Sequence, residues 1–410
     1  MRTILLLFLC SLALSQASAQ DLDAHLRAAA ELNPAVQARY AEFQAALKRS
    51  AQVRGLPDPT LTAGFSLTPP EKLMNAERAR FSLMQMFPWF GTLGAQAEVA
   101  DRQAEARYEA FLSARNELFY KVRVAYYPLH ELGRDIAIAK DDLAILRSYR
   151  AFAMARFKGG TGSMVDVLRI DLLINTEEND IAILEERRKP LQATFASTVG
   201  YAGPVIVDVS DSLQLVDLAN YTTDSLEHNP RLGELDRKAS AELARAEAAR
   251  KMGLPRFGLG VEYMAMDKRS PLMMPGMSSG EVMPMVSLSL PIYRNKYRSA
   301  VEEAQSLEQA VQAMRQQTAN ELGSAYETAY FEAHKAALNV QLMDRQIGIA
   351  QQALNLLLDA YSNSGDDLEE VLRMQEQVLR FRLMRLSAMR EHHTAIAQLD
   401  YLTAKQIVRP

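Results

Sequence analysis

Apolar residues recur every three or four positions along residues 21–54, which is the spacing of an amphipathic helix with an early break at Asn33-Pro34. Gly55-Leu56-Pro57 ends this helix, and the period of the pattern then changes to two. Two segments, 60–68 and 80–87, alternate apolar and polar residues, as strands with one apolar face do. We therefore expect a helix followed by two strands.

The helical period returns after the second strand. Residues 91–157 are predicted to form one helix, roughly 100 Å long if continuous, although Pro128 is expected to kink or interrupt it. A glycine-rich turn at 158–163 separates this helix from a returning helix over 164–200. The pattern predicts a long helical hairpin with its tip at the turn.

The second half of the chain repeats this order. It contains a helix that ends at Met252, strands at 256–266 and 283–290, and long helices over 297–361 and 368–404 with a turn at 362–367. Landmarks such as Asn33-Pro34 and Asn229-Pro230 recur at an offset of about 200 residues, which indicates an internal duplication. We expect a first repeat over 20–200, a linker over 201–220 and a second repeat over 221–410.

The returning helix of the second half carries two adjacent apolar stripes. Leu368, Leu372 and Leu379 lie on one stripe, and Val371 and Val378 lie on the other. A simple coiled coil needs one stripe. Two stripes predict a neighbouring helix on each side, as in helices packed around a ring.

The N-terminus and the composition limit the cellular setting. Residues 1–19 combine a basic start, a short apolar run and the small residues Ala17-Ser18-Ala19, which predicts a secretory signal peptide. Cys10 lies within it, so the mature chain would have no cysteine for disulfides or thiolate metal sites. The net charge of −4 gives no electrostatic case for nucleic acid. No later run of apolar residues is as long as the about 18 residues that a membrane-spanning helix needs.

The strands point instead to a membrane barrel. Each has about 8 to 11 residues, the length of a tilted membrane-spanning strand. Aromatic residues end both descending strands, at Phe87-Pro88-Trp89-Phe90 and Pro291-Ile292-Tyr293, as at a membrane interface. A soluble hairpin with one buried face is the alternative. In lipid, the four strands of one chain cannot close into a barrel. Two chains would give a barrel plugged by its own side chains, and three chains give twelve strands around an open bore. We therefore expect a homotrimer.

The signal peptide, the duplicated plan and the Val165-Asp166-Val167-Leu168 tip motif together resemble the TolC family of outer-membrane efflux ducts, over nearly all of the mature chain. The resemblance implies a mainly α fold with a membrane β-barrel, built by a trimer with four strands per chain in a twelve-stranded barrel. The barrel would lie in the lipid of a Gram-negative outer membrane, and the helices would form a tunnel through the periplasm. A periplasmic adaptor (membrane fusion protein) and an inner-membrane pump of the RND or ABC type would meet the tips.

In that family, acidic residues after the tip turns surround the closed periplasmic entrance. By match to the motif, these residues are Asp166 in the first hairpin and Glu370 in the second, and Asp366 and Asp367 lie in the second turn itself. Three copies would form a negative ring that attracts cations. The basic residue usual in the second turn is missing, which leaves Arg373 or Lys158 to hold the tip closed. Capping of a helix N-terminus is the alternative role for the acids.

Methionines concentrate around the second pair of strands. Seven lie between residues 264 and 285: Met264, Met266, Met273, Met274, Met277, Met283 and Met285. Those in the strands, with Met84 and Met86, fall on the polar side of the alternation, so lipid contact does not explain them. Thioethers suit Cu(I) or Ag(I), which would place the chain in a heavy-metal efflux branch. Adaptable packing over the bore is the competing explanation.

The sequence contains no nucleophile–base pair, phosphate-binding glycine loop or metal-binding helix motif, so we expect neither an enzyme nor a cofactor. The leading hypothesis is a passive outer-membrane channel of a tripartite efflux or secretion system. The alternative is a soluble periplasmic coiled-coil adaptor or scaffold, which would be monomeric and need no detergent.

Overall fold

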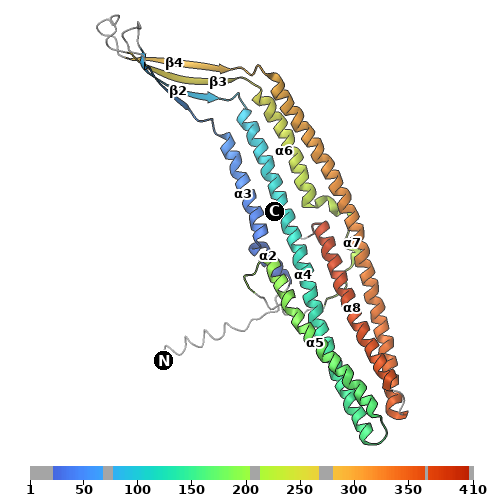
Figure 1. Ribbon diagram of the computed structural model, residues 1–410. Coiled ribbons are helices and arrows are strands. Elements are labelled where there is room, and N and C mark those ends of the chain that lie inside the picture. The colour runs from blue at the N-terminus through green and yellow to red at the C-terminus, as the bar shows by residue number, and fades with distance from the viewer. Residues whose placement is uncertain (1–21, 68–76, 204–212, 267–279, 365–367, 406–410) are drawn as a thin grey trace, which may run out of the picture. The chain divides into compact units, whose positions relative to one another are not determined.

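The computed structural model describes residues 22–67, 77–203, 213–266, 280–364 and 368–405. After α2 (Leu22–Leu32), a helix, two strands and two long helices follow one another twice (Figure 1). The first set is α3 (Pro34–Arg54), β1 (Thr60–Phe65), β2 (Glu77–Phe87), α4 (Thr92–Lys158) and α5 (Met164–Val199). The second set is α6 (Pro230–Met252), β3 (Arg256–Met266), β4 (Gly280–Ser289), α7 (Arg294–Ser364) and α8 (Leu368–Leu402). Two short 3-10 helices, η2 (Leu218–Asn220) and η3 (Thr223–His228), lie between the sets.

The chain forms two compact units, and each unit takes segments from both halves. Unit 1 comprises Met1–Ala38, Leu112–Pro230 and Ala319–Pro410, and unit 2 comprises Arg39–Phe111 and Arg231–Thr318. Both sets of elements therefore contribute to both units. The predicted signal peptide, 1–19, lies outside the described residues.

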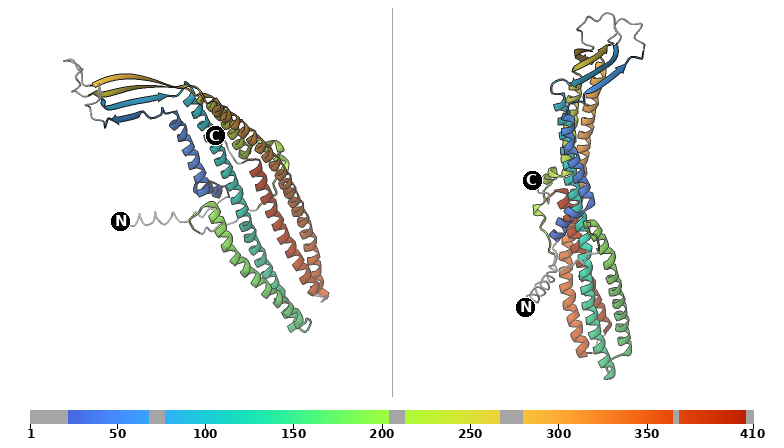
Figure 2. Two further views of the ribbon diagram at one scale, coloured as in Figure 1. Left: turned by 45° about the horizontal axis from the view of Figure 1, so that its top comes forward. Right: turned by 90° about the vertical axis from the view of Figure 1, so that its left-hand side faces the viewer.

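Unit 2 contains one antiparallel sheet with the strand order β1-β2-β3-β4. Figure 2 shows these strands side by side in one layer. Leu83 of β2 lies opposite both Leu61 of β1 and Val261 of β3. Because directly opposite residues of an antiparallel pair share a face, the apolar positions of all four strands gather on one side. This apolar face includes Leu61, Ala63, Phe65, Phe81, Leu83, Phe87, Phe257, Leu259, Val261, Tyr263, Val282, Val286 and Leu288.

The strand positions were predicted correctly, and their ends differ by a few residues. β1 ends at Phe65 instead of residue 68, and β4 covers 280–289 instead of 283–290. β2 begins at Glu77 instead of residue 80 because backbone pairing continues to Met266 through an irregularity between Glu77 and Ala79. Charged residues and a bulge interrupt the period of two, so the pattern gave no signal there.

Unit 1 has a core shared by two helical hairpins, α4–α5 and α7–α8. The core takes residues from all four helices: Ala139, Leu143, Leu146, Ala153, Val167, Ile170, Ile174, Ile181, Ala350, Leu354, Tyr361, Leu368, Val371, Leu372 and Val378. Both predicted stripes of α8 contribute, so α8 packs against more than one neighbour, as expected. Gln375, which interrupts a stripe, is buried and donates a hydrogen bond to the Asp142 carboxylate of α4.

The two Asn-Pro landmarks occupy equivalent places in unit 1. The Asn33 Oδ1 accepts from the Ala35 N–H at 2.9 Å, and its Nδ2 donates to the Thr198 carbonyl near the end of α5. The Asn229 Nδ2 donates at 2.8 Å to the Leu402 carbonyl at the end of α8. Each asparagine thus ties the start of one helix to a carbonyl in the last turn of a returning helix, where carbonyls have no intrahelical partner.

Two expectations about the long helices need correction. Pro128 does not interrupt α4, which runs for 67 residues through it. α7 continues to Ser364, past the expected break at residue 362, and the Ser362 hydroxyl donates to the Asp359 carbonyl at 2.9 Å. In the described part of the chain, no helix combines the length and the apolar character needed to span a bilayer.

Candidate functional site

The second side of the sheet is its polar face, and it carries the strand methionines. Met84 lies opposite Gly260, which in turn lies opposite Met285, so both methionines are on this face as predicted. Met264 and Met283 share the same face by register. Met273, Met274 and Met277 lie outside the described residues, and for Met266 only the backbone position is described.

Two glycines of β3 open a notch in the polar face. A Cβ added at Gly258 would lie 2.6 Å from the Met86 sulfur, and one added at Gly260 would lie 3.0 Å from the Met84 sulfur. Both distances are below van der Waals contact, so the methionine side chains already occupy the space that a larger residue would fill. The notch therefore depends on glycine at these two positions.

The notch brings two thioethers to one hydroxyl. Ser287 Oγ of β4 lies 3.7 Å from Met84 Sδ and 3.6 Å from Met86 Sδ, with the hydroxyl as donor. Soft sulfur ligands grouped in this way can bind Cu(I) or Ag(I), and methionines can equally fill an irregular gap. The row of Met264 is different, because Arg80 and Glu281 flank it on the neighbouring strands.

The first hairpin tip is a tight turn capped by serine. Gly160 adopts a positive φ of 77°, and the Ser163 hydroxyl accepts from the Val165 N–H to cap α5. Asp166 lies in the first turn of α5, where a carboxylate interacts favourably with the helix dipole. The capping role considered for the tip acids belongs to Ser163 in this hairpin, which leaves the Asp166 carboxylate available for other contacts.

Arg156 connects the two tips within unit 1. Its Nη1 donates at 2.6 Å to the Tyr361 carbonyl of α7, and its Nη2 donates at 3.2 Å to the Thr161 carbonyl of its own turn. The guanidinium also lies over the Tyr361 ring, 4.6 Å from its centroid. Burial raises the pKa of the Tyr361 hydroxyl, Asp166 raises it further, and Arg156 opposes both effects.

The acids of the second tip have partners on α5 and α8. Glu370 pairs with Arg373 one turn along α8, and Glu369 pairs with Arg169 of α5 at 3.0 Å. Arg373 was one of the two predicted basic partners, and its pair with Glu370 lies within one helix. Arg156, which links the hairpins, was missed in the sequence. Asp366 and Asp367 lie outside the described residues.

Two adjacent histidines of α8 hold the segment before η2. His392 is fully buried; its Nε2 accepts from the Val216 N–H at 3.0 Å, and its Nδ1 lies 3.0 Å from the Ala333 carbonyl. This pattern fixes the neutral tautomer with the proton on Nδ1. Burial, aided by His392, lowers the pKa of His393 to about 4. In the sequence, the only local signal for this site is that His392 and His393 are adjacent.

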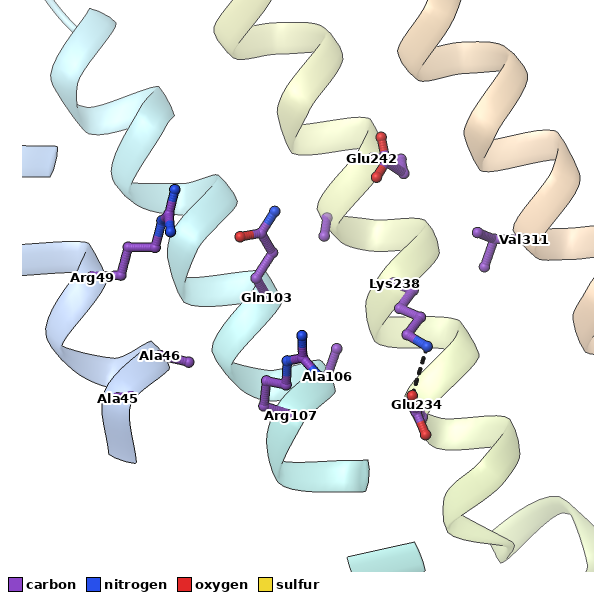
Figure 3. Close-up of a pocket in the computed structure, with 11 residues that line it drawn as sticks. Ala45, Ala46, Arg49, Gln103, Ala106, Arg107, Glu234, Lys238, Glu242 and Val311 are labelled. Carbon is purple, nitrogen blue, oxygen red and sulfur yellow. Dashed lines mark ion pairs between the residues drawn. The ribbon is translucent and has the colours of Figure 1, made fainter. Parts of the chain in front are cut away.

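Unit 2 contains a hollow of about 600 Å³ among α3, α4, α6 and α7. Arg49, Gln103 and Arg107 line its α3 and α4 side, while Glu234 and Lys238 form an ion pair of 2.6 Å on α6 (Figure 3). Glu242, the other acid in the lining, pairs with Arg245 at 3.5 Å. Cationic and anionic side chains therefore both line this hollow, and each of its carboxylates is paired.

Comparison with protein families gives one match that covers most of the chain. The model of the family described as "Outer membrane efflux protein" matches residues 25–200 and 222–405. The two matched ranges correspond to the two sets of elements described above.

Individual relatives are distant in sequence. The pyoverdine export outer membrane protein OpmQ of Pseudomonas putida is 24% identical over 352 residues, which are 81% of this chain and 68% of OpmQ. Among solved structures, CusC is 18% identical with a TM-score of 0.76, covering 94% of this chain and 92% of CusC. VceC of Vibrio cholerae is 15% identical with a TM-score of 0.71, covering 93% and 95%. These likenesses confirm the expected fold class.

Proposed function

This chain belongs to the outer membrane efflux protein family, and we propose that three copies of it form the outer-membrane channel of a tripartite efflux or secretion system. Membership confirms the resemblance to the TolC family and the outer-membrane location. The channel conducts passively, because its partners supply the driving force, and it needs neither a catalytic group nor a cofactor of its own.

One observation carries the proposal, namely the apolar face of the sheet. Val286 is 79% exposed and Leu61 is 69% exposed. Exposed apolar side chains on this scale are costly in water and favourable in lipid. The opposite face carries serine, threonine, charged residues and methionine, which suits contact with an aqueous bore.

The edges of the sheet support the trimer. Within the described residues, β1 and β4 each pair on one side only, so each leaves a row of backbone groups without a sheet partner. Unpaired backbone groups in hydrocarbon cost several kcal/mol each. Pairing β4 of one copy with β1 of the next removes these edges, and three copies give twelve strands around an open bore.

The two hairpin tips of unit 1 form the proposed periplasmic entrance, where a periplasmic adaptor and an inner-membrane pump of the RND or ABC type dock. Asp166 and Glu370 supply negative charge to this entrance in three copies, and we extend the proposed acidic set to Asp366 and Asp367 of the second turn. Arg156 holds the tips together through the Tyr361 carbonyl. Opening the entrance then requires this bond to break.

A specific observation favours Cu(I) or Ag(I) as cargo. The Met84 and Met86 sulfurs lie close to the same Ser287 hydroxyl, on the face that we assign to the bore. Three copies would place six such sulfurs around one lumen. We extend this proposal to Met264, Met283 and Met285 on the same face and to Met266, Met273, Met274 and Met277 nearby.

The proposal is tested by separating the envelopes of cells that express the full chain on a density gradient. We expect the protein in the outer-membrane fraction and its release only by detergent. Release by osmotic shock or by salt would instead support the soluble periplasmic adaptor and would overturn the channel.

A further inference from the structure

A second pocket, in unit 1, has a charge pattern unlike that of the hollow in Figure 3. It has a volume of about 350 Å³ and lies between α4, α8 and Leu213. Arg134 of α4 and Arg382 and Arg385 of α8 line it, together with the buried His130. No carboxylate is among its described lining residues.

The three arginines are partly buried, and Arg382 and Arg385 each contact a residue outside the lining. Arg385 pairs with Asp344 of α7, which does not line the pocket. Arg382 Nη2 donates at 3.4 Å to the Gln351 side-chain oxygen, a neutral partner. The three guanidinium groups line one small space from which water is partly excluded, and an anion there interacts with them more strongly than it would in open solvent.

The rest of the lining is apolar. Ile138, Leu213, Leu386 and Met389 contribute side chains, and Met389 is buried in a small core with Val340 and Ala388. A pocket of this size fits a small organic molecule, with a few polar groups fixing its orientation. Guanidinium groups bind carboxylate and phosphate with paired hydrogen bonds.

From this juxtaposition we propose that the pocket between α4, α8 and Leu213 binds a small organic anion, with its carboxylate or phosphate on the arginines and its apolar part against the leucines. Its lining residues all belong to unit 1 and include none of the sheet or tip residues named above, so the site does not depend on the proposed channel function. A bound anion contacts α4, α8 and Leu213 at the same time and so holds them against one another.

The test uses the full chain in detergent and phenyl phosphate as the probe, with binding measured by titration calorimetry. We expect saturable binding, weaker binding of inorganic phosphate because it lacks the apolar part, and no competition by benzylamine. If inorganic phosphate and phenyl phosphate bind with the same affinity, the apolar lining does not contribute to binding, and that part of the proposal is wrong. Failure of phenyl phosphate to bind, or competition by benzylamine, would overturn the site.

Variants of one helix assign the binding to the pocket. Arg382→Gln should weaken binding of phenyl phosphate about tenfold or more, because it removes charge-assisted hydrogen bonds. Arg382→Lys keeps the charge, and its affinity for phenyl phosphate should lie between those of Arg382→Gln and the unchanged chain. This second variant keeps the test decisive if Arg382→Gln fails to assemble. The matched control is Arg380→Gln, an exposed arginine on α8 paired with Glu376 and not part of the lining. Equal loss in the Arg380 and Arg382 variants would show non-specific charge attraction and overturn the proposal.

Discussion

Replacing Arg156 with glutamine should loosen the contact between the two hairpin tips. The change removes the Nη1 bond to the Tyr361 carbonyl, 2.6 Å long, and the stacking of the guanidinium on the Tyr361 ring. A hydrogen bond from a charged donor contributes about 1.5–3 kcal/mol and an exposed cation–π contact about 0.5–1 kcal/mol. Because the tip is partly exposed, we take about 2–3 kcal/mol for the sum.

That free energy corresponds to a shift of about 30- to 150-fold in the equilibrium between closed and open tips. Single-channel recording in planar bilayers measures it: the variant should open more often or conduct more than the unchanged protein. The matched control is Arg150→Gln, two turns earlier in α4, whose side chain pairs with Asp171 of α5 within the same hairpin. Traces of the Arg156 variant that match those of the unchanged protein would refute the role of this contact.

Three further predictions concern other parts of the chain. Burial lowers the pKa of His393 to about 4, so below about pH 6.5 the unfolded chain binds a proton more readily than the folded chain does. The free energy of unfolding should therefore fall by up to about 3 kcal/mol as the pH drops from 6.5 to 4. Denaturant titrations at several pH values measure this fall. If the free energy of unfolding of a His393→Phe variant changes with pH as steeply as that of the unchanged chain, His393 is not the cause. Val286→Arg on the apolar face should destabilise the protein in lipid by about 2–4 kcal/mol, whereas Thr62→Arg on the polar face should not; similar losses in refolding titrations would argue against lipid contact. Replacing Met84 and Met86 together with leucine should lower copper and silver tolerance of the host if the notch handles soft metals, and unchanged tolerance would count against that cargo.

The sheet was predictable because its signal is local. The period of two appears within each strand, and the apolar side of every strand could be read without knowing its partners. Pairing between β2 and β3 joins the two halves of the chain, and only this pairing places Gly258 beside Met86. The thioether notch therefore could not be found from either strand alone.

The tips show the same limit. The turn at 158–163 follows from a local pattern, and the structure places the end of α4 and the start of α5 at this turn. Asp166 was proposed only from its match to the family motif. Arg156 contacts Tyr361 only because the two hairpins share a core, and no local pattern states which faces of two helices meet. Because proline disfavours helix interiors, the sequence predicted a kink or an interruption at Pro128, and the structure excludes the interruption because α4 continues through this residue.

The central claim is that three chains combine their four-stranded sheets into one lipid-embedded pore. Native mass spectrometry of the purified protein in detergent, followed by ion-flux measurement on the same sample in liposomes, tests this claim most directly. We expect a complex of three chains that makes the liposomes permeable to ions. A monomer that stays dispersed without detergent and leaves the liposomes sealed would contradict it.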